Sequence, residues 1–389
     1  MKKTLAIILA GLLTLSFAAC GNTQEDNKNN DDSAQIDQNV IEEATSKGTF
    51  EYALNDKGDY EITNYEPYSI TAANITLPTE VNGIKIVGIA ANAFNAENSI
   101  KSVTIPDTYT YISDYAFYDC DSLKSVTLPS TIEKIGTSVF QSCDVLETIK
   151  IPAAVTEIPA FAFKDCKAIT SLDLTNVEKI QKGAFFNCTS LEAITVSNKL
   201  EYATRDAFVG CSSLKYNVEE NLLYLGDNTN KYVLLVQPNP EAITLDECVV
   251  SNTTKVIADY AFDICKDLKK ITLSDSVKVI NGTAFTSCTE LAYNKSENGL
   301  YLGTAENPYM VLIDLDVTSV EDFKLNKDTK IIAKTAFAKT LLLEDISFDG
   351  TKEEWTNIIK AEDWYGDLNI SITLANGETF SANEASTEE

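Results

Sequence analysis

The sequence predicts a curved, β-rich solenoid in which short structural units stack along one axis. Three features of the chain support this fold class. A phenylalanine recurs mostly every 22 or 23 residues, an isoleucine precedes most of these phenylalanines by five positions, and the units end in the alternating apolar residues of a short strand. Because a unit of this size buries its apolar face only against its neighbours, the stacked units are expected to share one continuous core.

Two columns of apolar residues define the repeat. The phenylalanine column comprises Phe94, Phe117, Phe140, Phe163, Phe185, Phe208, Phe262, Phe285 and Phe337. The isoleucine column comprises Ile89, Ile112, Ile135, Ile158, Ile180, Ile257, Ile280 and Ile332. Two intervals in the phenylalanine column are longer than the rest, at 54 and 52 residues, so two longer units interrupt the series.

Within one unit, a strand and a turn are expected on opposite sides. Leu123, Val126 and Leu128 follow the strand pattern L-x-x-V-x-L. Pro129 then ends the strand because it has no backbone N–H to donate. The preceding stretch A-F-Y-D-C is too short for a regular helix and predicts a 3₁₀ or single helical turn. Stacking pairs the strands about 4.8 Å apart into a parallel sheet, expected on the concave side of the solenoid with the turns opposite.

Seven cysteines form a third column, three residues after the phenylalanine of their units. They are Cys120, Cys143, Cys166, Cys188, Cys211, Cys265 and Cys288. Disulfides need Cβ atoms about 3.8 Å apart, closer than parallel units approach, and a line of thiols does not form the tetrahedron of a metal site. The column is therefore interpreted as buried thiols whose S–H groups donate to turn carbonyls. Cys248 is outside the register and has no predicted role, and the sequence leaves the redox state of the column open.

The two longer units, at about residues 213–250 and 290–325, match each other at a shift of 77 positions. Each predicts a β-hairpin, around G-D-N-T-N in the first unit, that projects from the edge of the solenoid. The hairpins carry four tyrosines: Tyr224, Tyr232, Tyr301 and Tyr309. These are expected to pack on the solenoid, and the enrichment of tyrosine at interfaces makes them an alternative binding surface.

The N-terminal region predicts export. Residues 1–19 place two lysines before an apolar run too short to span a bilayer comfortably, as in a signal peptide. The stretch F-A-A-C, which ends at Cys20, resembles the lipobox of bacterial lipoproteins and implies that Cys20 is lipidated; ordinary secretion with an unpaired Cys20 is the alternative. Residues 20–48 are acidic and polar and predict a disordered tether that displays the folded body outward. The sequence does not identify the membrane or the leaflet.

Caps are expected at both ends of the solenoid, because an open last unit exposes apolar surface and unpaired strand edges. The predicted order is an N-terminal β cap at residues 49–88, the solenoid at 89–340, a C-terminal cap at 341–380 and a disordered tail at 381–389. The first cap contains alternating strand residues around the turn D-K-G-D. The second contains Trp355 and Trp364, and Thr351 is expected to cap a short helix together with Glu354.

Composition excludes several classes of function. The chain has 58 acidic and 31 basic residues, which disfavours nucleic acid and anionic lipid as partners, so membrane contact is expected only through the lipid anchor. It has no histidine, which excludes Ser-His-Asp and Cys-His catalysis and the common zinc sites. Glu147 and Glu192 are candidates for a glycosidase pair, but a shallow sheet has no pocket to raise one carboxyl pKa. We expect a monomer without enzymatic activity, cofactor or metal.

The repeats are specific enough to resemble a known family. Units such as A-F-Y-D-C-D-S-L-K-S-V-T-L-P are similar to the BspA-like leucine-rich repeats of bacterial surface proteins, over about residues 49–375. The stretch G-T-K-E-E-W-T-N-I-I-K-A-E-D-W is similar to a closing motif of such proteins. The resemblance implies a leucine-rich-repeat solenoid and a cell-surface role in attachment to host matrix proteins or other cells. It implies no catalytic residue.

The outward positions of the predicted strands are the first candidate binding surface. They are polar and carry lysines on an otherwise acidic body. The candidate ligand-binding residues are Lys101, Lys124, Thr127, Lys150, Lys269, Lys270 and Thr272. The simpler interpretation is that lysine and threonine suit a solvated β surface. Two hypotheses remain: recognition of a host matrix protein, a bacterial surface protein or a glycan, and a structural envelope scaffold without a dedicated ligand.

Overall fold

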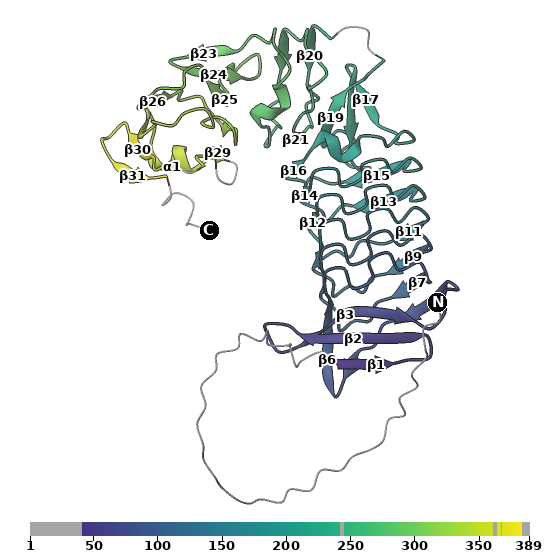
Figure 1. Ribbon diagram of the computed structural model, residues 1–389. Coiled ribbons are helices and arrows are strands. Elements are labelled where there is room, and N and C mark those ends of the chain that lie inside the picture. Colours follow the sequence, from purple (N-terminus) through teal and green to yellow (C-terminus); the bar gives the residue numbers. More distant parts are fainter. Residues whose placement is uncertain (1–40, 242–244, 361–363, 367, 383–389) are drawn as a thin grey trace, which may run out of the picture. The chain divides into compact units, whose positions relative to one another are not determined.

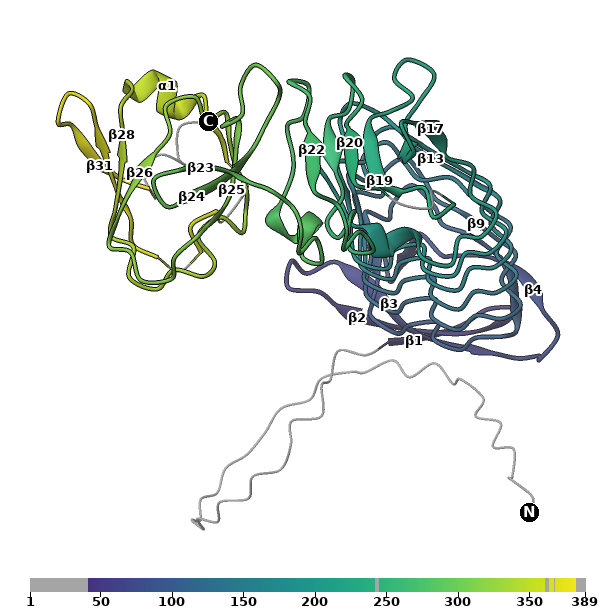
Figure 2. The same ribbon diagram turned by 90° about the horizontal axis from the view of Figure 1, so that it is seen from above.

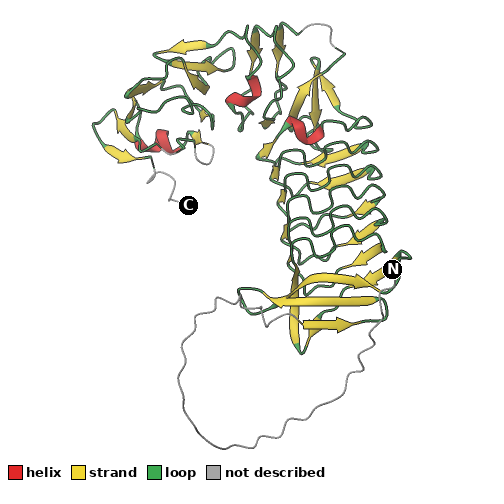
Figure 3. Cartoon of the chain, in the orientation of Figure 1, coloured by secondary structure: helices red, strands yellow, loops and turns green. Residues whose placement is uncertain are grey.

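The computed structural model describes residues 41–241, 245–360, 364–366 and 368–382, which belong to one compact unit. The predicted signal peptide, Cys20 and most of the predicted tether and tail lie outside the described residues. The described part consists mainly of short strands and turns, with one short α-helix and two 3₁₀ helices (Figure 3). The prediction of a curved solenoid built from parallel strands is confirmed (Figure 1).

The strands of the L-x-x-V-x-L pattern stack in parallel and form what we call the leucine ladder. They are β4 (Ala73–Thr76), β7 (Ile100–Thr104), β9 (Ser125–Thr127), β11 (Thr148–Ile149), β13 (Ser171–Leu174), β15 (Ala193–Val196), β20 (Glu247–Val249), β22 (Lys270–Thr272), β26 (Asp322–Leu325), β28 (Asp345–Phe348) and β30 (Ser371–Leu374). The register advances by one unit per strand, so Val103 pairs with Val126. Val126 is buried and Thr127 is exposed, as the period of two requires. Figure 2 shows these units stacked behind one another.

A second parallel ladder, not predicted from the sequence, runs along another side of the same units. This isoleucine ladder comprises β6 (Ile84–Ile89), β8 (Tyr111–Ile112), β10 (Lys134–Ile135), β12 (Glu157–Ile158), β14 (Lys179–Ile180), β16 (Tyr202–Ala203), β21 (Val256–Ile257), β27 (Ile331–Ile332) and β29 (Ile359–Lys360). The column isoleucine is buried and pairs with its equivalent in the next unit, as Ile112 does with Ile135. Isolated bridges from Thr204 to Asp259 and from Val256 to Val279 extend the ladder past the first longer unit.

The turns of neighbouring units are also hydrogen bonded. The N–H of Phe117 donates to the carbonyl of Val139 at 2.9 Å, and the same bond recurs in other units. Tyr115 and Asp119, on either side of Phe117, have positive φ angles of 58° and 59°, which direct the turn's polar groups along the stacking axis. The expected 3₁₀ turn is therefore uncommon: the described residues contain 3₁₀ helices at η1 (Arg205–Phe208) and η2 (Gly282–Phe285).

The phenylalanine column forms a stack in the core from Phe94 to Phe208, and Phe262 and Phe285 form a second stack after the first longer unit. The ring centroids of Phe117 and Phe140 are 5.6 Å apart with planes inclined by 13°, and those of Phe163 and Phe185 are 5.8 Å apart at 11°. Both arrangements lie in the separation range of favourable aromatic pairs. Phe185 is fully buried, as are most members of the column. The core is thus a column of stacked rings between the two ladders.

The thiols of the cysteine column donate hydrogen bonds to backbone carbonyl groups of the phenylalanine column. The Sγ atoms of Cys143, Cys166 and Cys188 lie 3.0 Å from the carbonyl oxygens of the phenylalanines in the preceding units. The described cysteines are free, so the predicted buried thiol donors are confirmed in this column. Cys265 follows a longer unit that has no column phenylalanine, and its sulfur makes no such bond. Cys248, which had no predicted role, is a buried residue of β20 paired with Ile271.

The two longer units do not project from the solenoid, contrary to the prediction. Their strands are β17 (Asn217–Glu219), β18 (Leu222–Leu225) and β19 (Leu234–Pro238) in the first, and β23 (Asn294–Ser296), β24 (Gly299–Leu302) and β25 (Val311–Leu315) in the second. The antiparallel hairpins form, but β19 and β25 then pair in parallel with β21 and β27 of the isoleucine ladder. All four residues of β18 are buried, because the hairpin occupies the place of an ordinary unit in the stack.

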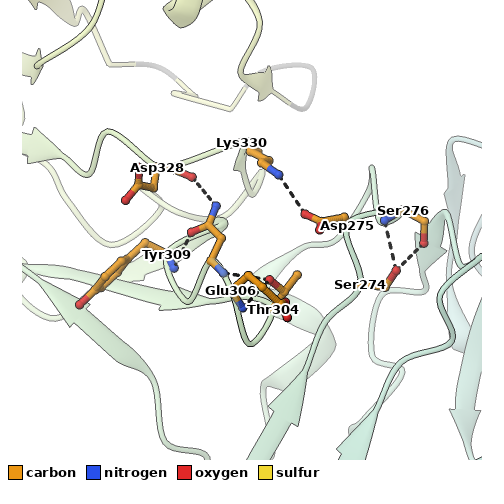
Figure 4. Close-up of polar contacts among 9 residues, drawn as sticks. Ser274, Asp275, Ser276, Thr304, Glu306, Tyr309, Asp328 and Lys330 are labelled. Atoms are coloured by element: carbon orange, nitrogen blue, oxygen red, sulfur yellow. Dashed lines mark hydrogen bonds and ion pairs between the residues drawn. The ribbon is translucent and has the colours of Figure 1, made fainter.

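An asparagine fastens the loop of each hairpin to the following unit. Asn230 Nδ2 donates to the carbonyl of Thr253 at 2.8 Å, and its Oδ1 accepts from the N–H of Tyr232 at 3.0 Å. At the matching position, 77 residues on, Asn307 donates to the carbonyl of Asp328 at 2.7 Å and accepts from Tyr309 at 3.1 Å (Figure 4). The matching contacts support an internal duplication of this block.

The N-terminal cap begins earlier than predicted. Strand β1 (Ile41–Ala44) pairs antiparallel with β2 (Gly48–Leu54), which pairs with β3 (Tyr60–Pro67) around the predicted turn. Residues 41–48 therefore belong to the folded cap and not to the tether assigned to residues 20–48. Composition misassigned them because the polar segment gains its order from pairing with β2. The cap joins the solenoid where β3 pairs in parallel with β6, whose start forms a small hairpin with β5 (Glu80–Val81).

The C-terminal cap is built around two buried tryptophans. Helix α1 (Lys352–Thr356) begins with the predicted capping box, in which Thr351 and Glu354 exchange side-chain to backbone hydrogen bonds. Trp355 is fully buried and lies edge-on to Trp364, with the ring centroids 6.1 Å apart. Strand β31 (Thr379–Ser381) pairs antiparallel with β30 and so covers the outer edge of the last strand of the leucine ladder. The described chain therefore extends just past residue 380, where the tail was predicted to begin.

Candidate binding surfaces

The structure places the candidate strand residues on the outer side of the leucine ladder, in two groups. Lys101, Lys124, Thr127 and Lys150 lie on three successive units and are exposed. Lys269, Lys270 and Thr272 lie together on β22 and the residue before it, separated from the first group by the units of β13 and β15 and by the first longer unit. The seven residues are therefore outward-facing but do not form one continuous patch.

Most of the candidate lysines are paired with a carboxylate of a neighbouring unit. Lys124 Nζ lies 3.3 Å from Glu147, Lys269 lies 2.9 Å from Asp246 and Lys270 lies 3.8 Å from Glu247. Each pair is separated by 23 positions, so equivalent positions of adjacent units carry opposite charges. The same arrangement pairs Lys215 with Glu192 and Lys167 with Asp144. The outer face of the leucine ladder is thus largely self-neutralised.

The carboxylates of the leucine ladder lack the environment of an acid catalyst. Glu147 and Glu192 are each paired with a lysine. The hydrogen bond and charge of Lys215 lower the pKa of Glu192, whereas a general acid needs a raised pKa. Among the described residues, no group of three or more metal-binding side chains is suitably placed to hold an ion.

The buried cysteines are poor nucleophiles. Burial raises the pKa of the Cys211, Cys248 and Cys288 thiols to about 12, and that of the half-buried Cys265 to about 11. A thiol in this range is protonated at neutral pH, and only the thiolate attacks. The thiols of the cysteine column therefore have a structural role in the core and are not nucleophiles.

The hairpin tyrosines are packing residues more than surface residues. Tyr224 and Tyr301 are fully buried, and their hydroxyl oxygens accept hydrogen bonds from the N–H groups of Ser251 and Asn326, each at 3.2 Å. Burial raises the pKa of Tyr301 to about 12. The half-buried Tyr232 and Tyr309 lie edge-on against Tyr224 and Tyr301. The alternative binding surface that the sequence suggested is therefore mostly inside the core.

A hollow of about 1280 Å³ lies over the isoleucine ladder, and no sequence motif indicated it. It extends along the units of β14, β16, β21, β27 and β29 and reaches the C-terminal cap at Trp364 and Tyr365. Its lining includes six lysines: Lys179, Lys199, Lys255, Lys278, Lys334 and Lys360. It includes three carboxylates: Glu178, Glu201 and Asp259. The sequence placed the concave sheet on the leucine strands, but the hollowed surface belongs to the other ladder.

Parallel ladders, buried leucines and isoleucines and a repeat of 23 residues define the class of leucine-rich-repeat solenoids. The model of the BspA-type leucine-rich repeat region matches residues 87–227 and 241–306 in six copies. The match covers more than half of the chain, so the chain belongs to the BspA-type leucine-rich repeat family. No curated protein matches it in sequence.

Several solved structures resemble the chain. A leucine-rich cell surface protein of Faecalibacterium prausnitzii is 21% identical, with 83% of this chain and 98% of that chain covered and a TM-score of 0.42. A leucine-rich repeat protein of Bacteroides ovatus is 16% identical, with 85% and 99% covered and a TM-score of 0.44. The pneumococcal vaccine antigen PcpA is 14% identical, with 86% and 93% covered and a TM-score of 0.36. In the part of this chain that the structure describes, no helix is long and apolar enough to cross a membrane.

Proposed function

We propose that this chain is an exported protein, displayed at the cell surface, that recognises a protein or glycan ligand through the extended surface of its solenoid. Family membership supports a binding role without catalysis. The lipobox-like stretch that ends at Cys20 supports a lipid anchor, and the acidic composition supports display away from anionic membrane surfaces. The solenoid offers long, rigid faces suited to a macromolecular ligand.

The observation that favours recognition over a scaffold is the charge of the hollow. Lysines outnumber carboxylates among its lining residues, on a chain whose formal net charge is −27. On the leucine ladder, by contrast, several lysines form ion pairs with carboxylates of adjacent units. A scaffold has no need of a hollow whose charge is opposite to that of the whole molecule, whereas a binding site does.

Label-free binding to an array of host matrix proteins, mucins and bacterial glycans tests the proposal. The chain from Asn22 onward is compared with a leucine-ladder variant that carries Lys124→Glu, Lys269→Glu and Lys270→Glu. Saturable binding to one class of ligand is expected. If no ligand binds with saturation, the scaffold function takes its place.

The leucine-ladder variant also tests the candidate residues predicted from the sequence. Loss of binding in this variant assigns the site to the outer face of the leucine ladder. Unchanged binding removes Lys124, Lys269 and Lys270 from the site, because reversing all three charges must alter any contact that they make with a charged or polar ligand.

A further inference from the structure

The floor of the hollow is a continuous part of the isoleucine ladder. Strand β14 pairs with β16, a bridge joins Thr204 to Asp259, and another joins Val256 to Val279. The N–H of Gly282 then donates to Thr335 Oγ1 at 2.9 Å, which links that unit to the unit of β27. The relative positions of the lining residues are therefore fixed by hydrogen bonds from unit to unit.

The hollow has three carboxylates for six lysines, so half of its positive charge is not compensated within the lining. Asp259 accepts hydrogen bonds from Asn281 Nδ2 at 2.9 Å and from the Tyr202 hydroxyl at 3.2 Å, so its oxygens are engaged by neutral donors. Lys199 Nζ donates to the amide oxygen of Asn176 at 2.9 Å. Within the residues that the structure describes, Lys255, Lys278 and Lys334 have no ion pair.

Two of these lysines occupy equivalent positions of adjacent units. The N–H of Lys278 donates to the carbonyl of Lys255 at 2.8 Å, so the two side chains start one ladder spacing apart on the same face. Like charges at such a distance are destabilising in a sheet. On the leucine ladder, the same 23-residue relationship joins Lys101 to Lys124, but there Lys124 forms an ion pair with Glu147 of the next unit.

We propose that the hollow binds an anionic oligosaccharide, with Lys255, Lys278 and Lys334 contacting its carboxylate or sulfate groups. This inference rests on the proposed recognition function and names its ligand class and site. Lys255 and Lys278 supply two charges at the spacing of the units and Lys334 adds a third from the unit of β27, which suits a polymer with repeated anionic groups better than a single small anion. The volume of about 1280 Å³ exceeds the usual range of roughly 300–1,000 Å³ for small-molecule sites, in keeping with an oligomer.

Aromatic side chains support a sugar as the rest of the ligand. Tyr202 lies on the floor and is half-buried, and Tyr365 lies at the cap end, edge-on to Trp364 with the ring centroids 5.2 Å apart. Each ring presents an apolar body with a polar tip, which suits the mixed faces of a sugar ring. The cap end is held in place because Trp364 also packs against Phe337 at 5.6 Å.

An acidic peptide fits the floor less well. Peptides that bind to sheets commonly add a strand to an exposed edge. Here β14 lies between β12 and β16, and β27 lies between β25 and β29, so these floor strands already have neighbours on both sides. A peptide in the hollow would have to rely on side-chain contacts alone, whereas a glycan needs no backbone pairing.

A matched pair of double variants tests the site. The hollow variant carries Lys255→Glu and Lys278→Glu, which keeps a like-charged pair on adjacent units and so preserves the repulsion between them. The control carries Lys57→Glu and Lys266→Glu, two exposed lysines outside both the hollow and the candidate residues of the leucine ladder, and makes the same change in net charge. Circular dichroism and the thermal midpoint establish that both variants fold.

The probes are heparin-derived and polygalacturonate oligomers of defined length, a neutral dextran oligomer and a poly-glutamate peptide, each titrated by calorimetry. We expect at least one anionic oligomer to bind wild type and the control. In the hollow variant its affinity should fall by about a hundredfold, since two charge-assisted contacts are lost. Because heparin carries both sulfates and carboxylates, binding of heparin but not of polygalacturonate assigns recognition to sulfate, whereas binding of polygalacturonate shows that carboxylate is sufficient.

Three results overturn the inference: no binding of either anionic oligomer, equal losses in the hollow variant and the control, or poly-glutamate binding as tight as that of the oligosaccharides. The proposed function is tested separately. Saturable binding of a matrix protein or a neutral glycan that the hollow variant retains leaves recognition standing and rejects only this site and its ligand class.

Discussion

The two ladders of the solenoid follow the same repeat but carry different charge patterns. On the leucine ladder, several adjacent units place opposite charges at equivalent positions, as in Lys124 with Glu147 and Lys269 with Asp246, and Lys101 beside Lys124 is an exception. On the isoleucine ladder, adjacent units place Lys255 beside Lys278. The repeat sets only the spacing of the positions. The side chains at these positions decide whether the lysines of a face are paired with carboxylates or are available to an anionic ligand.

The core that both ladders share gives the largest predicted effect. Phe185 is fully buried between Phe163 and Phe208, whereas its sequence neighbour Phe186 is exposed and lies near Lys164. Phe185→Ala is expected to lower the free energy of unfolding by about 3–5 kcal/mol, because it leaves a cavity in the stack. Phe186→Ala is the control and should cost less than about 1 kcal/mol. Denaturant unfolding followed by circular dichroism measures both, and similar losses would contradict the stacked core.

The cysteine column provides a smaller test of the same core. Cys166 is fully buried and bonds to a carbonyl oxygen, whereas Cys265 is half-buried and makes no such bond. Cys166→Ala should cost about 1–2 kcal/mol of unfolding free energy, since it removes the donor and leaves a small void. Cys265→Ala should cost clearly less. Equal costs would show that the sulfur-to-carbonyl bond adds nothing measurable to stability.

The same variant should show a pH dependence with a definite sign. Burial raises the pKa of the Cys166 thiol above its ordinary value of 9.0. As the pH rises through that ordinary value, the unfolded wild-type chain releases this proton and the folded chain does not, so the unfolded state is favoured. The stability advantage of wild type over Cys166→Ala is therefore full below about pH 9 and shrinks above it. Unfolding midpoints at about pH 7.5 and about pH 10 measure the change, and a constant advantage would argue against a buried, protonated thiol.

The smallest predicted effects on stability come from single charge pairs, one on the outer face of the leucine ladder and one on the isoleucine ladder. A double-mutant cycle on Lys124 and Glu147 should give a favourable coupling of roughly 0.2–1 kcal/mol, since the pair is exposed. Lys278→Glu places a carboxylate beside Lys255 and should raise stability slightly, because it converts a like-charged pair into an opposite one. Thermal midpoints at low and high salt measure both effects. If Lys278→Glu lowers the midpoint at low salt, Lys255 and Lys278 do not repel each other.

Much of the fold could be predicted because it repeats. The phenylalanine column, the leucine strands and the cysteine column each recur, so a weak local signal is strengthened by its copies. The capping box of Thr351 and Glu354 follows local hydrogen-bonding rules, and the structure confirms it. The isoleucine ladder was missed because most of its strands have two residues, too few to show the alternation by which a strand is recognised.

The remaining differences depend on contacts between distant residues. Strand β1 lies in an acidic segment that has no strand signal of its own and is ordered by pairing with β2. The hairpins looked like insertions because their length exceeded one unit, yet β19 and β25 complete the stack. The hollow joins residues from Glu178 to Leu368, so no short motif describes it. The leucine-ladder lysines were recognised as exposed, but the sequence alone did not show that most of them are paired.

The stacking of each unit on its nearest neighbours has a mechanical consequence. A pull on the two ends of the chain loads the terminal unit first, and its release breaks only the contacts to one neighbour. An ordinary unit of 23 residues lengthens the chain by roughly 80 Å when fully extended. The two longer units, at about residues 213–250 and 290–325, would yield longer steps than an ordinary unit. Under shear, the molecule should therefore lengthen in discrete steps, each absorbing work while the rest of the stack stays intact.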